Sequence, residues 1–384
     1  MPRVLCDPWT VPGFTTPPPE AGALLVHRRL PSYAPTPLRS LLGLAARLGV
    51  GGVLLKDESV RLGLPAYKIL GAAWATYRAL TRRLGRTPEP WRDLAELRAR
   101  LGPLAPVTLV TATDGNHGRG VARVARWLGL PADIYLPGGT APARLAGIRS
   151  EGARVIEVQG TYDAAVARAA AAESEDALLI QDHGWPGYEE IPEWVAEGYE
   201  TIFFEVDEEL GARGEPPLDL ILVQIGVGTL ASAVVRHYRR AGLEHRPALV
   251  GVEPTGAACA LLSIEAGHPV MIPAGADASI MAGLNCGTPS SAAWPLMRDG
   301  MDAFVAVEDD QAREAMQLLA DAGVVAGESG AAGLAGLIEL LEGSNAVEAR
   351  SRLQLTTASR VLLLVTEGAT DPANWERVTG RRLP

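Results

Sequence analysis

Short aliphatic runs alternate along this chain with segments of helical periodicity, and this alternation restricts the fold more than any other feature. The runs are residues 53–55, 107–110, 134–136, 155–158, 220–225, 249–252 and 361–365. Helical segments are expected from about residue 68 onward and over 119–128, 141–150 and 162–172. Strands that alternate with helices form βαβ units on a mainly parallel sheet. We therefore predict an α/β fold of two domains, each a mainly parallel open sheet flanked by helices.

Length and composition exclude several classes of protein. A chain of 384 residues is long enough for two domains. Its hydrophobic content of 47% is too high for a disordered protein. A net charge of -10 argues against a nucleic-acid-binding surface. The uncharged run at residues 220–235 is shorter than the roughly 20 residues of a membrane-spanning helix.

The cysteines and the start of the chain indicate a compartment. Three cysteines, Cys6, Cys259 and Cys286, are too few for a disulfide scaffold. The proline-rich first residues contain no apolar signal segment. We therefore expect a cytoplasmic enzyme.

Lysine is rare, which narrows the possible chemistry. Only two of the 35 basic residues are lysines, Lys56 and Lys68. A Schiff base, which needs a side-chain primary amine, therefore has two candidates. Lys56 lies beside two acidic residues, where we expect an ion-paired ammonium. Lys68 lies between Tyr67 and Ile69 at the start of an apolar helix, where desolvation would lower its pKa and make it a nucleophile. The alternative is a helix lysine whose ammonium reaches solvent.

The sequence TATDGNHGRG at residues 111–120 follows an aliphatic run and opens a helical segment. Glycines let the backbone approach a ligand, and a helix N-terminus favours an anionic group such as a carboxylate. Asp114, Asn116 and His117 add side chains that form hydrogen bonds or transfer protons. The alternative is an ordinary turn in which Asp114 caps the helix.

A second glycine-containing loop, Gly226-Val227-Gly228-Thr229, follows the run at 220–225. Its backbone amides could bind a phosphate. With Ala231 it also fits the dinucleotide pattern G-x-G-x-x-A, and Glu253 would be the ribose-binding acid of a nucleotide-binding oxidoreductase. Two further polar blocks, residues 327–330 and 365–371, are either turns or site residues.

These blocks, in this order, resemble the fold-type II pyridoxal-phosphate enzymes, which include serine and threonine dehydratases, cysteine synthase and threonine synthase. Closer detail resembles the diaminopropionate ammonia-lyases, from about Ser32 to Asp371. The most telling residue is Asp114, because the dehydratases usually carry a serine nearby. The matching stretches are residues 33–38, 56–59 with 61, 63–64, 111–120, 181–182, 187–188, 280–284, 286–287, 327–330, 366–368 and 370–372.

The resemblance implies a bound pyridoxal 5'-phosphate and a set of residues that hold it. Lys68 would carry the cofactor as a Schiff base, Asn116 would bind its ring oxygen and Thr366 its pyridine nitrogen. The phosphate would bind the loop from Gly226 to Thr229. The implied cofactor residues are Lys68, Asn116, Gly226, Val227, Gly228, Thr229, Glu328 and Thr366.

The resemblance also implies the reaction, an α,β-elimination that converts 2,3-diaminopropionate to pyruvate and ammonia. Lys68 would take the Cα proton of the L-isomer, and Asp114 would serve the D-isomer. Asp182 would be the partner of the departing β-ammonium. The implied substrate-binding residues are Thr113, Asp114, His117 and Tyr67.

Further expectations concern domains and partners. The resemblance implies a large cofactor-binding domain of residues 1–103 and 185–384 and a small domain of 104–184. It implies a small amino-acid substrate, a homodimer, and a disulfide between Cys259 and Cys286, for which two free thiols are the alternative. We expect no metal, nucleic acid or membrane partner. Rival functions are a serine/threonine dehydratase or a racemase of the same fold, the oxidoreductase, and a ligand sensor without turnover.

Overall fold

The computed structural model describes residues 2–104, 106–273 and 278–383. It divides into two compact units. Unit 1 comprises Met1–Glu20, Pro35–Val60 and Ile202–Pro384, and unit 2 comprises Ala21–Ala34 and Arg61–Thr201. The long helix α8 (Glu190–Arg213) and the 3-10 helix η1 (Glu58–Gly63) contribute residues to both.

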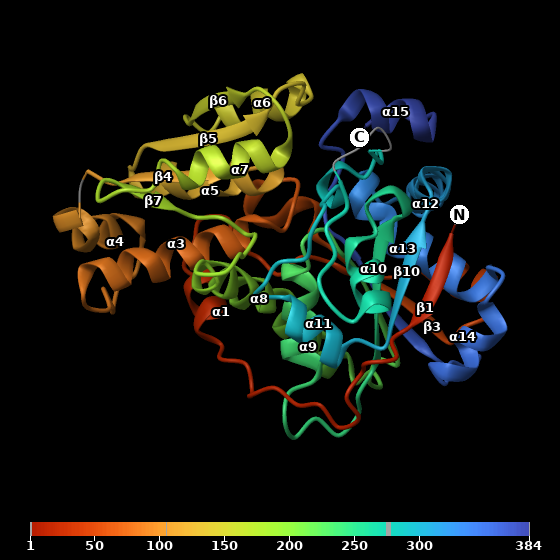
Figure 1. Cartoon of the computed structure of the whole chain (residues 1–384). Helices are drawn as coiled ribbons and strands as arrows, with labels where there is room; N and C mark the ends of the chain where they lie inside the picture. Colours follow the sequence, from red (N-terminus) through yellow and green to blue (C-terminus); the bar gives the residue numbers. More distant parts are fainter. Residues whose placement is uncertain (1, 105, 274–277, 384) are drawn as a thin grey trace. The chain divides into compact units, whose positions relative to one another are not determined.

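Unit 1 is built on a seven-stranded sheet (Figure 1). Its central strands are parallel and its two edge strands, β1 and β2, are antiparallel to their neighbours. Parallel strands are typically buried on both faces and rich in aliphatic residues, as the predicted runs are. The strand order is β1 (Arg3–Cys6), β10 (Ala303–Val307), β9 (Ala248–Pro254), β8 (Leu220–Gln224), β11 (Arg360–Val365), β3 (Gly52–Asp57) and β2 (Leu38–Ser40).

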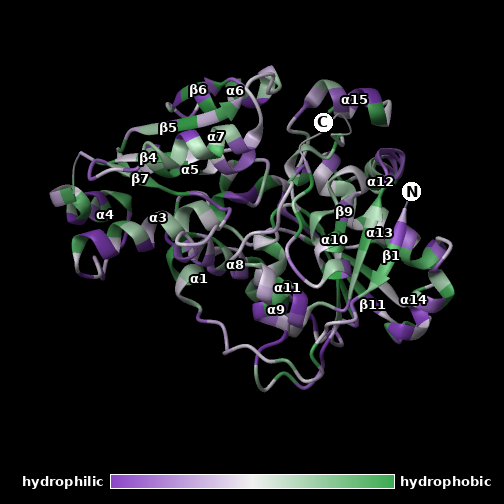
Figure 2. Ribbon diagram, viewed as in Figure 1, coloured by the Kyte–Doolittle hydropathy of each residue, from purple (hydrophilic) through white to green (hydrophobic). Residues whose placement is uncertain are grey.

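Helices flank this sheet. The helix α13 is almost entirely buried and packs on β8, β10 and β11, with α12 beside it. Figure 2 shows hydrophobic residues along β9 and β11 and hydrophilic ones on α12. The helices of unit 1 are α2 (Leu42–Leu48), α9 (Thr229–Tyr238), η3 (Thr255–Ala257), α10 (Cys259–Ala266), η4 (Ala282–Leu284), α11 (Trp294–Gly300), α12 (Asp309–Asp321), α13 (Glu328–Glu342), α14 (Ala346–Arg352) and α15 (Pro372–Thr379).

Unit 2 carries a smaller sheet of four parallel strands (Figure 1). Their order is β6 (Arg154–Val158), β5 (Ala132–Pro137), β4 (Thr108–Ala112) and β7 (Ala177–Leu179). The helices α5 and α7 pack on β4 and β5. The helices of unit 2 are α1 (Gly22–His27), α3 (Ile69–Leu84), α4 (Leu94–Leu101), η2 (Gly102–Leu104), α5 (Asn116–Leu128), α6 (Pro142–Arg149) and α7 (Tyr162–Ala170).

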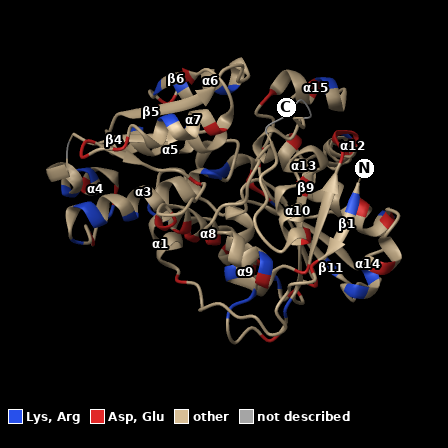
Figure 3. Cartoon of the chain, viewed as in Figure 1, with Lys and Arg blue, Asp and Glu red and all other residues tan. Residues whose placement is uncertain are grey.

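The predicted fold class is confirmed, since both units are mainly parallel sheets flanked by helices. The predicted small domain, residues 104–184, lies within unit 2, which also contains residues 21–34, 61–103 and 185–201. Its boundaries stay a prediction. Among the helices of the described residues, none has both the length and the apolar character needed to cross a membrane. Figure 3 shows acidic residues gathered along α8.

Candidate active site

Lys68 stands at the start of α3, and its ammonium is bound to a carboxylate from a distant part of unit 2. Nζ donates a hydrogen bond to Asp182 Oδ2 at 2.6 Å. The side chains of Lys68 and Asp182 are 20% and 7% exposed. An ion pair shielded from water in this way interacts more strongly than one on the surface. Lys68 is therefore an anchored ammonium, which disfavours the alternative of a lysine that reaches solvent.

Two tyrosines flank the same ammonium. Nζ lies 5.5 Å from the ring centroid of Tyr67 and 5.9 Å from that of Tyr199, within the range of a cation–π interaction. The two rings are 4.7 Å apart. Tyr199 belongs to α8, far along the chain from Lys68, and is not among the predicted site residues. No local pattern marks this tyrosine, because its role comes from the packing of α8 on α3.

The predicted lowering of the Lys68 pKa is wrong. Burial lowers the pKa of Lys68, but the charge of the Asp182 carboxylate and its hydrogen bond to Nζ hold it well above its usual value. The prediction considered desolvation alone, because the sequence does not reveal which anion meets the amine. The Lys68 amine is consequently protonated when Asp182 is ionised and no other cation lies beside that carboxylate.

Asp182 and His117 form a second contact in this cluster. Burial raises the pKa of Asp182, but the charge of His117 when that ring is protonated, and the charge and hydrogen bond of Lys68, lower it by more, so the carboxylate stays ionised. Burial lowers the pKa of His117, which favours a neutral ring. Its Nε2 donates to the Ile180 carbonyl oxygen at 2.8 Å, since a carbonyl can only accept. Nδ1 is therefore the unprotonated nitrogen, and it lies 3.7 Å from Asp182 Oδ2.

The loop that carries Asp182 is held by its neighbours. Gln181 Oε1 accepts hydrogen bonds from Thr111 Oγ1 and from the Ala112 amide, both at 2.9 Å. The Gln181 amide donates to Tyr188 Oη at 3.0 Å, and that hydroxyl donates to the Leu179 carbonyl at 2.8 Å. These bonds tie residue 181 to the end of β4. They explain how a short loop can place the next residue, Asp182, against Lys68.

The loop at residues 111–120 is a tight turn from β4 into α5. Thr113 Oγ1 accepts hydrogen bonds from the amides of Gly115 and Gly118 at 2.9 and 3.0 Å. A Cβ on Gly118 would lie 2.3 Å from Thr113 Cγ2, so only glycine fits there. Gly115, at φ +151, is the residue before the helix. Thr113 therefore holds this turn with two hydrogen bonds, and the role of Asp114, as a cap or as a catalytic group, stays a prediction.

Asp114 and Asn116 flank Gly115 in this turn. Asn116 is the first residue of α5. Burial is the main cause that raises the pKa of Tyr67, and the negative charge of Asp114 adds to it. The field of Asp114 therefore reaches the tyrosine beside Lys68. Unit 2 thus brings together Lys68, Asp182, His117, Tyr67 and the Asp114 turn.

In unit 1, the loop after β8 has the features of an anion site. Gly228 has φ +97, and a Cβ there would lie 2.6 Å from the Met297 side chain. A Cβ on Gly226 would lie 3.0 Å from the Gly283 carbonyl oxygen. The helix α9 begins at Thr229, and the residue before it, Gly228, has no side chain that could cap it. Uncapped amides at a helix N-terminus attract anionic groups such as phosphate.

Glu253, the acid of the dinucleotide alternative, has a structural role. Its two oxygens accept hydrogen bonds from the amides of Ala260 and Leu261, both at 2.8 Å, at the start of α10. Burial raises the pKa of this fully buried carboxyl to about 7. Because both oxygens of Glu253 already bind amides at the start of α10, this carboxyl group is not available to bind a ribose. The alternative of a dinucleotide-binding oxidoreductase therefore has no ribose-binding acid at residue 253.

Thr366 and Glu328 lie at the adjacent ends of β11 and α13. Thr366 directly follows β11, is 5% exposed, and donates to the Ser329 carbonyl oxygen at 3.5 Å. Glu328 is the first residue of α13 and accepts a hydrogen bond from Asn374. The two polar blocks are thus side by side: the Glu367 side chain also accepts from the Ser329 amide at 3.2 Å.

The other lysine has a structural environment, as predicted. Lys56 is fully buried in unit 1, with Nζ 2.8 Å from Glu205 Oε2 and 2.7 Å from the Thr36 carbonyl oxygen. Its ion-pair partner is Glu205 on α8 and not a sequence neighbour. Lys68 is therefore the lysine with a partly accessible amine. In the described part of the chain, no cluster of three or more His, Cys, Asp or Glu side chains could hold a metal ion.

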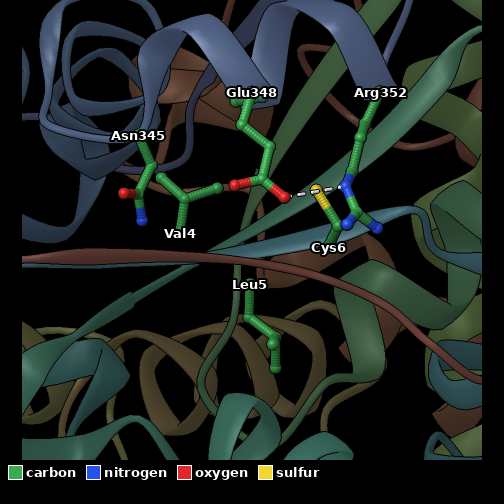
Figure 4. A pocket seen from close by; sticks show the side chains of 7 residues that line it. Val4, Leu5, Cys6, Asn345, Glu348 and Arg352 are labelled. Atoms are coloured by element: carbon green, nitrogen blue, oxygen red, sulfur yellow. Dashed lines mark ion pairs between the residues drawn. The ribbon is translucent and has the colours of Figure 1, made fainter.

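None of the three cysteines in the described part of the chain forms a disulfide, which contradicts the bond implied for Cys259 and Cys286. Burial raises the pKa of Cys259 well above its usual value, and the nearby Glu253 and Cys286 raise it further. Cys6 lines a separate cavity of about 170 Å³ between β1 and α14. Figure 4 shows the ion pair of Glu348 and Arg352 there. None of the predicted site residues lines that cavity.

Known proteins resemble this chain along nearly its whole length. The family described as pyridoxal-phosphate dependent enzyme matches residues 30–367. Diaminopropionate ammonia-lyases of Salmonella typhimurium and Escherichia coli are 37% and 35% identical to it. Each match covers 92% of this chain, and 90% and 89% of the two relatives. A crystal structure of the Escherichia coli enzyme with D-serine matches with a TM-score of 0.89 and 32% identity, over 99% of this chain and 97% of the other.

Proposed function

The chain belongs to the family of pyridoxal-phosphate-dependent enzymes, and from this premise we propose that it is an ammonia-lyase acting on 2,3-diaminopropionate. It eliminates ammonia from the L-isomer, and from the D-isomer as well, and leaves pyruvate and a second ammonia after hydrolysis. The observation that carries the proposal is the Lys68 amine, held at 2.6 Å from Asp182 beside the Asp114 turn. The two relatives that match along their length support the substrate.

The residues present fit pyridoxal phosphate. Lys68 has the primary amine that a Schiff base requires, and its side chain is partly accessible. In the loop from Gly226 through Val227 and Gly228 to Thr229, Gly228 has the positive φ of +97 that favours glycine, and as the residue before α9 it has no side chain to cap that helix. That is the chemistry of a phosphate cradle. We assign the pyridine nitrogen to the Thr366 hydroxyl.

Two further side chains complete the proposed cofactor site. Asn116 would donate its amide to the ring oxygen, and Glu328 would lie with Thr366 at the edge of the site. When bound, pyridoxal phosphate supplies an electron sink for the carbanion at Cα. A neutral hydroxyl at the pyridine nitrogen, in place of an acid, suits elimination because it limits the build-up of charge on the ring.

The residues around Lys68 then move the protons. Lys68, once neutral, takes the proton from Cα of the L-isomer. Asp114, from the turn before α5, takes it from the D-isomer. Asp182 holds the β-ammonium, which must stay protonated to leave as ammonia. Thr113, His117 and Tyr67 line the substrate position, and the D-serine complex of the Escherichia coli relative supports a site that accepts D-amino acids.

A visible spectrum and an activity assay test the proposal. The purified protein should absorb as a pyridoxal-phosphate protein and should release pyruvate when mixed with 2,3-diaminopropionate. Borohydride reduction should attach the cofactor to Lys68, and the Lys68→Ala variant should lose both the attachment and the activity. A colourless protein that takes up no pyridoxal phosphate would refute the proposal. Attachment to Lys56 would refute the assignment of the lysine.

The rival functions of the same fold differ in the leaving group. A serine/threonine dehydratase or a racemase would also use Lys68 and Asn116, and would not need Asp114 and Asp182. The same assay with serine separates them, since a dehydratase would prefer the hydroxyl leaving group. We further propose a cytoplasmic homodimer, which light scattering and cell fractionation would test.

A further inference from the structure

The ammonium of Lys68 is bound by three groups that together form a site for one cation. Asp182 Oδ2 accepts its hydrogen bond at 2.6 Å. The rings of Tyr67 and Tyr199 lie with their centroids 5.5 and 5.9 Å from Nζ. We call Asp182, Tyr67 and Tyr199 the ammonium site. One carboxylate and two aromatic rings are the groups that recognise an alkylammonium ion.

Tyr199 is built into this site by close helix packing. A Cβ on Gly71 of α3 would lie 2.6 Å from the Tyr199 ring, and one on Gly198 of α8 would lie 2.7 Å from the Leu70 carbonyl oxygen. Each helix therefore presents a glycine where the other approaches. This close packing of α3 and α8 holds the fully buried ring of Tyr199 next to Lys68.

The hydroxyl of Tyr199 adds a second indication that a ligand belongs here. Its oxygen is buried, and Lys68 is the neighbour whose charge and hydrogen bonding lower the Tyr199 pKa, against the effect of burial. Burial holds the pKa of Tyr199 well above its usual value, so the hydroxyl stays neutral. A buried hydroxyl cannot bond to water, so a cation at the position of the Lys68 ammonium is the group that satisfies it. An ammonium has three N–H groups, of which Asp182 accepts one.

We propose that the ammonium site binds the β-ammonium group of the diamino-acid substrate, and that Tyr199 selects this leaving group over a hydroxyl. The inference rests on the proposed function. Lys68 must be neutral when it takes the Cα proton, so at that moment its charge is absent from the site. The β-nitrogen of diaminopropionate is also a primary alkylammonium. The Lys68 ammonium in this structure therefore shows how the substrate nitrogen is recognised.

The elimination step balances with a single positive charge in the site throughout. The neutral amine of Lys68 forms a bond to the Cα proton, and the electron pair of the Cα–H bond becomes the Cα=Cβ double bond. The Cβ–N bond breaks, and its electron pair leaves with the nitrogen as neutral NH₃. The charge moves from the β-ammonium to Lys68. No further acid, oxidant or reductant is consumed.

A hydroxyl leaving group would break this balance. The β-hydroxyl of serine carries no charge before the step, so Asp182 and the two rings would hold no cation. The departing oxygen would also need a proton from another acid. The ammonium site therefore favours an amine over a hydroxyl as the leaving group. This selectivity depends on the two aromatic rings as well as on Asp182.

The test compares two variants of Tyr199 in the holoenzyme. Tyr199→Phe keeps the ring, and Tyr199→Leu removes it. The measured quantity is kcat/KM for 2,3-diaminopropionate divided by kcat/KM for serine. A cation–π contact is worth about 0.5–2 kcal/mol, so we expect this ratio to be about 2- to 30-fold lower in Y199L than in Y199F. Equal ratios in the two variants, or equal losses on both substrates, would overturn the proposal.

A second variant and a matched control cover the case that Y199L does not fold. Tyr67→Leu removes the opposite ring and should lower the ratio in the same direction. Tyr238→Leu is the matched control, because Tyr238 is also a buried tyrosine but belongs to α9 in unit 1. It should leave the ratio unchanged. A ratio that falls in Y238L as much as in Y199L would show a general effect of removing a buried tyrosine ring and would overturn the assignment.

Trace acetylation provides a readout that needs no turnover. In the cofactor-free full chain, the pH dependence of Lys68 labelling gives its pKa by mass spectrometry. The pKa should fall by about 0.4–1.5 units in Y199L, as the loss of a cation–π contact requires. An unchanged pKa would refute the ammonium site even where pyruvate is formed. Failure of the proposed function is a different result: no pyruvate is formed, while the labelling still reports on the site.

Discussion

Replacing Asp182 by asparagine would remove the anion that holds Lys68 protonated, while keeping the shape of the side chain. Nζ and Oδ2 are 2.6 Å apart, and both groups are largely buried. An opposite charge at such a distance shifts a pKa by about 1–3 units. Because Asp182 raises the pKa of Lys68, its loss should lower that pKa by this amount. At a pH below the pKa, the neutral fraction of the amine should rise about 10- to 1,000-fold.

Amine labelling measures this change directly, since the chain has only two lysines. Lys56 is fully buried against Glu205, so the labelled side-chain amine is Lys68. The variant Asp182→Asn should label faster than the wild type at pH 8, and its elimination of ammonia should nonetheless fall. The control is Asp133→Asn, which breaks an ion pair with Arg154 elsewhere in unit 2. An unchanged labelling profile in D182N would refute the account of the Lys68 pKa.

Three further predictions follow from single sites. Asp114→Asn should reduce activity on the D-isomer at least tenfold more than on the L-isomer, and equal losses in steady-state assays would contradict the role of Asp114. Gly228→Ala should weaken pyridoxal-phosphate uptake at least tenfold and cost about 1–3 kcal/mol of stability, measured by fluorescence titration and urea unfolding, because φ is +97 and the Met297 side chain fills the space. Burial raises the pKa of Glu253 to about 7, so its contribution to stability is full below its unfolded value near pH 4.3 and is lost as pH rises through 7. The melting temperature of Glu253→Gln should therefore fall less than that of the wild type between pH 4.5 and 8, and parallel curves would contradict the buried carboxyl.

The fold was accessible from the sequence because its signals are local. Aliphatic runs mark buried parallel strands, and the predicted helices at 141–150 and 162–172 correspond to α6 (Pro142–Arg149) and α7 (Tyr162–Ala170). Glycine at 118 reflects a steric limit within its own turn, where the Thr113 side chain leaves no room for a Cβ. The spacing of residue types within one segment is therefore enough to predict its secondary structure and its tight turns.

The candidate site was accessible only in part. The scarcity of lysine pointed to Lys68, and the resemblance to a known family pointed to Asp114, Asp182 and the loop at Gly226. The sequence does not reveal the direction in which the pKa of Lys68 shifts, and no motif in it points to Tyr199. Both depend on segments more than 100 residues away, which reach Lys68 only through folding.

The sequence by itself determined the α/β class, the number of available amines and the glycine-bearing turns, since these follow from composition and from contacts within single segments. The tertiary structure decided which charges and rings meet: Asp182 and Tyr199 with Lys68, and Glu205 with Lys56. The physical reason is that Coulomb energy, desolvation and cation–π attraction depend on distances of a few ångströms and on exclusion of water. Chain spacing does not contain those distances, and the packing of α8 on α3 creates them.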